Sequence, residues 1–109
     1  MRILDFEVER QRVKKSTNCD FSGLVAGSVG YLRARFNFVG SDWKDCPTMI
    51  ARFWVDDKEY AILLDKNNSC EIPPEVLKEK KFAVSVLGAN TAYYKIETNK
   101  IYVRQEVIK

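Results

Sequence analysis

The sequence predicts an all-β fold: a two-sheet sandwich of about seven short strands that forms a single domain over residues 1–109. Apolar and polar residues alternate with a period of two in successive segments, which places neighbouring side chains on opposite faces of a sheet. Turn-forming residues separate these segments at intervals of about 8 to 12 residues, the spacing typical of a sandwich. No segment longer than one turn has convincing helical periodicity. A small barrel is the alternative that the same pattern allows.

The first two strands flank a polar loop. One strand is expected from residue 4 toward residue 13, and a loop over residues 15–21, where short polar side chains compete for backbone amides. Residues 31–38 form the clearest strand of the chain, because every second residue is apolar. The apolar residues on the core faces of these two strands are Leu4, Phe6 and Val8, then Leu32, Ala34, Phe36 and Phe38.

A hairpin is expected in the middle of the chain. The polar connection over residues 40–47 contains Trp43, which is interpreted as a wedge that closes one end of the sandwich, with a ligand platform as the alternative. Residues 49–55 have apolar groups on both faces, which indicates a central strand. A tight turn at residues 56–58 joins it to a strand over residues 60–64.

One helical turn interrupts the strand pattern near residues 73–78. It follows a polar turn at residues 65–69, and its two prolines cannot donate ladder hydrogen bonds. Proline is well placed at the first position of a helix, and Glu75 lies near the positive end of the helix dipole. We expect Val76 and Leu77 to plug this turn onto the edge of the sandwich.

The remainder of the chain again alternates as strands do. Residues 82–87 are expected as a core strand and residues 88–90 as a turn, since Gly and Asn readily adopt turn conformations. A strand begins at residues 93–96, breaks or bulges at residues 98–100, and the last strand covers residues 101–107.

The charge pattern does not indicate nucleic acid or membrane as a partner. The net charge is +3, and acidic residues lie within or beside the basic groups near residues 10–15 and 78–81, which favours a solvated surface. No apolar run approaches the roughly 20 residues of a membrane span, and the N-terminus lacks the apolar stretch of a signal peptide. The glycine-rich segment GLVAGSVG has no following lysine and precedes a strand, so no phosphate or cofactor site is predicted.

The chemistry of the side chains argues against an enzyme or a metal protein. There is no histidine, so Ser-His-Asp and Cys-His arrangements are impossible. The carboxylate pairs Asp42 with Asp45 and Asp56 with Asp57 lie in predicted turns, where aspartate usually makes local hydrogen bonds. The three cysteines match no close metal-ligand spacing, which leaves free thiols or a single bridge. No catalytic, metal or cofactor site is therefore predicted.

Large aromatic side chains are the remaining candidates for a binding surface. Aromatic residues on loops and outer sheet faces are typical interface anchors, although each one has a core position as its alternative. The candidate binding residues are Tyr31, Trp43, Trp54, Tyr93 and Tyr94.

Two segments of the chain resemble a known family. The runs YLRARFNFVGSDWKDCPTMIARF and YAILLDKNNSCEIPPEVLKEKKFAVSVLG are similar to immunoglobulin-like domains of tail and baseplate proteins in phages of Gram-positive bacteria. The shared features are an aromatic-x-aromatic strand end before an acidic-Trp turn, a segment of the form Ile-Pro-x-Glu-Val-Leu, and a strand that ends in Gly88. The resemblance covers residues 24–105, but the stretch ANTAYYKIETN lacks the glycines and the Tyr-Pro-Thr stretch usual in the family.

The resemblance implies an antiparallel immunoglobulin-like sandwich in a non-catalytic structural or assembly protein of the phage tail or baseplate. It implies a location in the virion after synthesis in the host bacterial cytoplasm, with other virion proteins and further copies of the chain as partners. Two other functions stay open from the residues. One is a small phage-encoded inhibitor that binds a host defence protein. The other is a carbohydrate-binding module that stacks sugars on Trp43, Trp54 or Tyr94.

Overall fold

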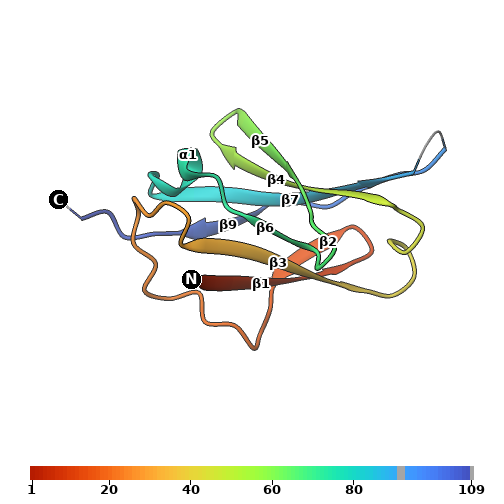
Figure 1. Ribbon diagram of the computed structural model, residues 1–109, viewed down its shortest axis with the longest axis horizontal. Coiled ribbons are helices and arrows are strands. Elements are labelled where there is room, and N and C mark those ends of the chain that lie inside the picture. Colours follow the sequence, from red (N-terminus) through yellow and green to blue (C-terminus); the bar gives the residue numbers. More distant parts are fainter. Residues whose placement is uncertain (91–92, 109) are drawn as a thin grey trace.

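Two packed β-sheets make up the protein. The computed structural model describes residues 1–90 and 93–108, and this part of the chain contains nine strands and one helical turn. The first sheet has the order β2-β1-β3-β6, and in the second sheet β5, β4 and β7 are followed by β8 and β9, which both pair with β7. Figure 1 shows the sheets as a lower and an upper layer. The predicted all-β sandwich is confirmed.

The strand bounds follow the predicted segments closely in the middle of the chain. The first sheet consists of β1 (Arg2–Glu9), β2 (Arg12–Lys15), β3 (Leu32–Val39) and β6 (Ser69–Glu71). The second consists of β4 (Thr48–Val55), β5 (Lys58–Leu63), β7 (Lys81–Ala89), β8 (Lys95–Glu97) and β9 (Ile101–Arg104). The predicted hairpin is the β4–β5 pair, and the predicted break at residues 98–100 separates β8 from β9.

Aromatic side chains from both sheets fill the core. Phe6 of β1 stacks on Phe36 of β3 with ring centroids 5.2 Å apart, and Phe53 of β4 lies 6.3 Å from Phe82 of β7. These four rings are at most 2% exposed. Because the alternating apolar residues of the strands face inward, the sequence pattern located this core correctly.

The N-terminal part of the chain departs from the prediction in two ways. The expected single strand from residue 4 toward residue 13 is a hairpin, since Arg10 adopts a left-handed backbone conformation (φ 52°) that reverses the chain. In addition, β1 pairs in parallel with β3, from Arg2 opposite Leu32 to Glu9 opposite Val39, whereas every other paired strand is antiparallel in the described part. The strand β6 was also not predicted, because it is only three residues long.

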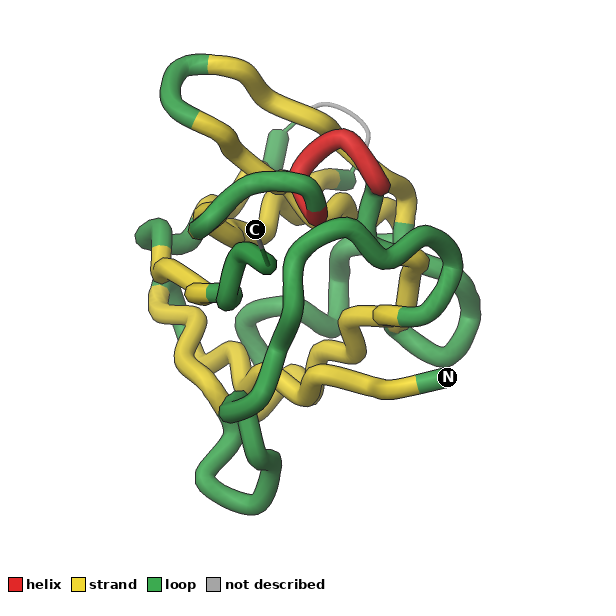
Figure 2. Tube along the Cα trace, turned by 90° about the vertical axis from the view of Figure 1, so that its left-hand side faces the viewer, coloured by secondary structure: helices red, strands yellow, loops and turns green. Residues whose placement is uncertain are grey.

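The predicted helical turn is present as α1 (Pro74–Leu77). Its side chains Val76 and Leu77 are fully buried, as expected for a plug on the sandwich. The carbonyl of Leu77 accepts hydrogen bonds from the Gly27 amide at 2.8 Å and from the Gln105 side chain at 3.0 Å. Figure 2 shows the molecule from this end, with the helical turn near the top and the β4–β5 hairpin standing away from the body.

Candidate interaction surface

The strand β5 forms one outer edge of the second sheet. It pairs with β4 along all six of its residues, and no other strand pairs with it in the described ranges 1–90 and 93–108. The two-residue turn at Asp56 and Asp57 joins the two strands, and Asp56 has the positive φ (53°) that tight hairpins require. The hairpin therefore presents one side of an extended strand to its surroundings.

The hydrogen-bond phase of the hairpin identifies the backbone groups on this outer edge. The Leu64 amide donates to the Met49 carbonyl at 2.9 Å. Successive residues of an antiparallel ladder alternate between bonded and non-bonded pairs, so residues two apart are of the same kind. By this alternation, Lys58, Tyr60 and Ile62 exchange bonds with β4. The N–H and C=O groups of the three residues between and after them point away from β4. These residues are Glu59, Ala61 and Leu63.

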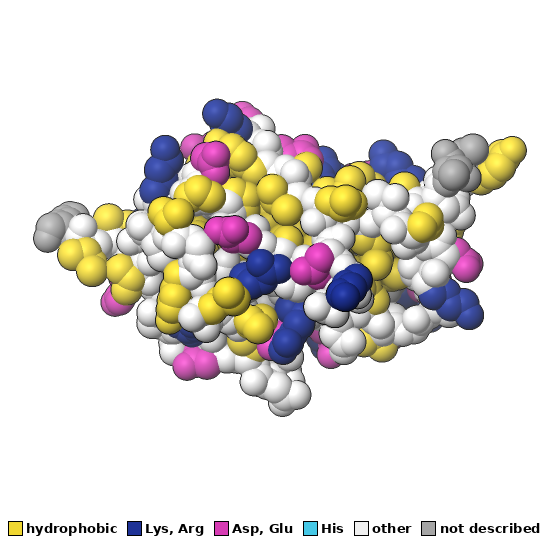
Figure 3. Space-filling view, viewed as in Figure 1, with side chains coloured by type: hydrophobic (Ala, Val, Ile, Leu, Met, Phe, Trp, Pro, Cys, Tyr) yellow, Lys and Arg dark blue, Asp and Glu magenta, His cyan; other side chains and the backbone are white. Residues whose placement is uncertain are grey.

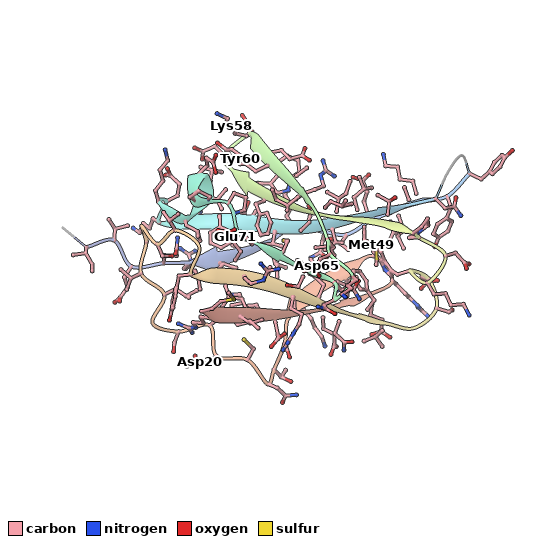
Figure 4. The ribbon with its side chains drawn as sticks, in the orientation of Figure 1. Asp20, Met49, Lys58, Tyr60, Asp65 and Glu71 are labelled. Atoms are coloured by element: carbon pink, nitrogen blue, oxygen red, sulfur yellow. The ribbon has the colours of Figure 1, made fainter. Side chains whose placement is uncertain are left out.

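Apolar side chains line the open side of the sandwich between β5 and β6. Tyr60, Ile62 and Leu64 are half-buried against the core, and Leu63 on the outer face is 66% exposed. In Figure 3 hydrophobic side chains gather in a band between the hairpin and the lower sheet, with charged groups above and below. Figure 4 locates Lys58 and Tyr60 on the hairpin and Glu71 and Asp65 on the opposite side of this band.

Two hollows lie at the ends of the apolar band. A groove of about 590 Å³ runs between the β4–β5 hairpin and α1, where Tyr60 and Glu75 line its walls. A smaller hollow of about 190 Å³ lies near Met49 and Phe38 at the other end. Lys58 extends over the ring of Tyr60 with its Nζ 5.6 Å from the centroid. The open side thus combines the edge of a strand, an apolar surface and two shallow hollows.

The other sheet edges are protected in ways that β5 is not. The strand β6 has three residues and is followed by Pro73 and Pro74, which cannot donate to a ladder. The edge formed by β8 and β9 is interrupted at residues 98–100. Short strands, prolines and breaks are the usual protections of an edge against pairing with another chain. With six residues and no proline, β5 lacks each of these.

The opposite side of the sandwich is closed by hydrogen bonds between the two sheets. Asn99, in the break between β8 and β9, accepts a hydrogen bond from the Val13 amide at its Oδ1 (2.9 Å). The backbone N–H of Asn99 donates a hydrogen bond to the Gln11 carbonyl at 3.1 Å. These bonds connect the β1–β2 hairpin of the first sheet to the edge of the second. We call this the closed side and the β5–β6 side the open side.

Trp43 closes one end of the sandwich, in agreement with the interpretation from the sequence. It is 2% exposed, its Nε1 donates to the Arg10 carbonyl at 2.8 Å, and its ring lies 5.1 Å from that of Phe38. The indole packs on the backbone of Gly88, where an added Cβ would lie 2.7 Å from a ring carbon. Trp43 and Gly88 therefore form one packing unit, although they are far apart in the sequence.

Trp54 lies on the outer face of the second sheet among charged groups. Its Nε1 donates to Ser85 Oγ at 3.0 Å, and Lys100 Nζ lies 3.7 Å from a ring centroid. The guanidinium of Arg52, 4.7 Å from the ring, donates to the carboxylates of Glu59 and Glu97. The hydrogen bond from Arg52 lowers the pKa of Glu59 and keeps its carboxylate ionised. The Trp54 ring is thus already in contact with cations of the protein.

The three candidate tyrosines do not form a common surface with the tryptophans. Tyr31 is 49% exposed and lines a hollow near Leu24, and Tyr93 is 97% exposed. Tyr94 is 37% exposed, and its hydroxyl donates to the Asp42 carbonyl at 2.7 Å beside the Trp43 turn. Thr91 and Ala92, within the stretch that departs from the family pattern, lie outside the described residues.

The cysteines are free thiols in this structure. Cys46 and Cys70 are each 4% exposed, and Cys19 is partly exposed. Burial raises the pKa of the Cys70 thiol to about 12, and it also raises that of Cys46, to which nearby Asp45 contributes. Within residues 1–90 and 93–108, no group of three or more Cys, Asp or Glu side chains is placed to hold a metal ion. None of the described helices is long and apolar enough to cross a membrane.

The residues of the β5 edge were not among the candidates from the sequence. Alternation in this segment identified the strand and its two faces, but it does not say which strand ends a sheet. That position depends on how distant segments pair. Comparison of the chain with protein-family models, with curated proteins and with solved structures gives no match.

Proposed function

We propose that this protein is a non-catalytic structural or assembly module of a phage particle, part of the tail or baseplate, that acts through protein–protein contacts at its open side. The observation that best supports contacts at the open side is the outer edge of β5, with the backbone groups of Glu59, Ala61 and Leu63 facing outward. Such an edge binds an extended segment of a partner by adding a strand to the sheet. The absence of histidine from the sequence favours binding over catalysis.

The assignment to a phage particle is supported by the sequence resemblance alone. The matched residues include Trp43 and Gly88, which contact each other at the end of the sandwich that Trp43 closes. The resemblance therefore includes a packing unit of the fold, and the fold is of the kind that the resemblance implies. The resemblance implies several copies of the chain in one particle, for which edge pairing is a suitable form of attachment.

Mass spectrometry of purified particles of the encoding phage tests the assignment. We expect the protein in a fixed ratio to the other tail proteins, and we expect it to remain after extensive washing. Immunogold labelling then locates it at the tail. Particles without the protein would reject the structural role.

The same experiment separates the inhibitor function from the structural one. If particles lack the protein, affinity capture from host lysate with the wild-type chain should recover one host protein in stoichiometric amount. Ala61→Pro provides the control, since it alters the edge of β5 and leaves the ladder to β4 intact.

A further inference from the structure

The outer edge of β5 is self-complementary, and we propose that two copies of this chain pair through it across a twofold axis at Ala61. This inference deepens the proposed function by naming a partner for the open side, a second copy of the protein. The second sheets of the two copies would become one continuous antiparallel sheet. Closed twofold symmetry is the commonest arrangement of homo-oligomers.

The register follows from the backbone groups that point away from β4. Only the N–H and C=O groups of Glu59, Ala61 and Leu63 face outward, so hydrogen-bonded pairs must join these residues to one another. An antiparallel arrangement with Ala61 opposite its own copy also places Glu59 opposite Leu63 of the second copy. All of the outward-facing groups of both strands are then satisfied.

The neighbouring registers are less favourable. Placing Glu59 opposite Ala61, or Ala61 opposite Leu63, leaves the backbone groups of the third residue without a partner. Placing Glu59 opposite its own copy brings two carboxylates together, which destabilises a cross-strand pair. The register centred on Ala61 is therefore the one that the edge favours.

The side chains also fit this register. Tyr60 lies opposite Ile62 of the second copy on the inner face, twice in the dimer, and aromatic residues pair favourably with β-branched ones across strands. Leu63, which is 66% exposed, comes to lie beside Glu59, whose carboxylate is held by Arg52 at 2.7 and 3.0 Å. Lys58 faces Leu64, so no like charges oppose each other across the axis.

The protection of the other edges favours β5 as the site of pairing. The short β6 precedes two prolines, β2 is tied to Asn99 through Val13, and the edge of β8 and β9 is broken. The hairpin that contains β5 stands away from the body of the molecule, so a second strand can approach it (Figure 2).

Sedimentation of the purified full-length chain over a range of concentrations tests the pairing. We expect a monomer–dimer equilibrium for the wild type and a monomer for Ala61→Pro, with a dissociation constant raised at least about tenfold. The N–H of Ala61 faces outward, so proline there removes no bond to β4, and circular dichroism should report an unchanged fold. A wild-type chain that stays monomeric at its highest soluble concentration overturns the proposal.

Two substitutions at one position test the register and do not depend on proline being tolerated. Leu63→Lys places an ammonium opposite Glu59 of the second copy, whereas Leu63→Glu places a second carboxylate there. Because each dimer contains this pair twice, the dissociation constants of the two variants should differ on the order of tenfold, with Leu63→Lys the tighter dimer. Equal dissociation constants, or the opposite order, reject this register.

A symmetric cross-link locates the axis itself. Ala61→Cys in a Cys19→Ser background should form a disulfide-linked dimer under mild oxidation, since only in this register do the two Cβ atoms of position 61 lie side by side. Glu59→Cys in the same background should form none. Cross-linking through position 59 in place of 61 would overturn the proposed axis.

The outcomes also separate this inference from the proposed function. If the chain forms the dimer in solution but is missing from purified particles, the pairing is supported and the assignment to a particle is rejected. A chain that is present on particles but monomeric in solution, and insensitive to changes at Ala61, rejects the pairing and keeps the assignment.

Discussion

The two sides of the sandwich are completed by different means. On the closed side, Asn99 in the break between β8 and β9 bonds with Val13 and Gln11 of the β1–β2 hairpin. Polar groups at the edges of the two sheets thus satisfy one another. On the open side, β5 keeps a row of outward backbone groups above an apolar band. The comparison shows that this sequence closes edges with specific residues. Within the described part of the chain, the edge of β5 has no such bonds, and it contains neither a proline nor a break; its charged residues, Lys58 and Glu59, lie at its first two positions.

The largest effect should come from the end of the sandwich, where Trp43 packs on Gly88. Trp43→Ala removes a fully enclosed indole and its hydrogen bond to Arg10, so the free energy of unfolding should fall by about 3 to 5 kcal/mol. Urea unfolding followed by circular dichroism measures it. Tyr93→Ala is the control, because Tyr93 is 97% exposed and its loss should change stability by less than about 0.5 kcal/mol. Similar losses for both variants would show that Trp43 does not close the end.

The buried thiol on β6 should make stability depend on alkaline pH. Burial raises the pKa of Cys70 from 9.0 to about 12, so above pH 9 the unfolded chain loses this proton before the folded one does. The contribution of Cys70 to the free energy of unfolding is then constant below pH 9 and falls as the pH rises toward 12, by about 1.4 kcal/mol for each pH unit.

The measurement compares the free energy of unfolding of the wild type with that of Cys70→Ala from about pH 8 to about pH 11. We expect the difference between the two proteins to narrow as the pH rises, since the variant has no thiol to ionise. Parallel curves would mean that Cys70 ionises in the folded state as easily as in the unfolded one.

A smaller effect is expected from the other partner in the Trp43 contact. Gly88→Ala places a Cβ 2.7 Å from the indole, and the overpacking should lower stability by about 1 to 3 kcal/mol. Trp43→Phe makes room at this position, so the double variant should lose less stability than the sum of the single variants. Thermal unfolding of the wild type, the two single variants and the double variant gives the coupling energy between the two positions. If the losses of stability simply add, the contact between Trp43 and the new Cβ is not the cause of the loss in Gly88→Ala.

The smallest effect should appear at the closed side. Asn99→Ala leaves the Val13 amide without its acceptor, and we expect a loss of about 1 to 2 kcal/mol in the free energy of unfolding. Asn67→Ala is the matched control, since the side chain of Asn67 is exposed. Hydrogen exchange at the Val13 amide should speed up only in the Asn99 variant. Unchanged exchange there would mean that the closed side is held by other contacts.

Local features of the fold were predictable, and its long-range pairing was not. The β4–β5 hairpin, the turn at Val76 and Leu77 and the break before β9 each depend on a few neighbouring residues. The parallel pairing of β1 with β3 and the three residues of β6 depend on segments that meet only in the folded chain.

The candidate site shows the same division. Composition identified the large aromatics, and the interpretation of Trp43 as a wedge is confirmed by its burial. Its contact with Gly88 could not be read from two positions so far apart. Ala61, at the centre of the proposed contact, has no distinguishing chemistry, because its importance lies in which way its backbone groups point.

The parallel pairing of β1 with β3 joins residues that are far apart in the chain, as do the pairings of β3 with β6 and of β4 with β7. Each of the hairpins β1–β2 and β4–β5 joins neighbouring residues, and such hairpins form in about 1 to 10 μs. The pairing of Arg2 with Leu32 has to wait until the long crossover between β2 and β3 is in place. The strand β1 thus acquires its second neighbour, β3, after its first, β2. Substitutions in the crossover, at residues 16–31, should therefore speed unfolding more than they slow folding.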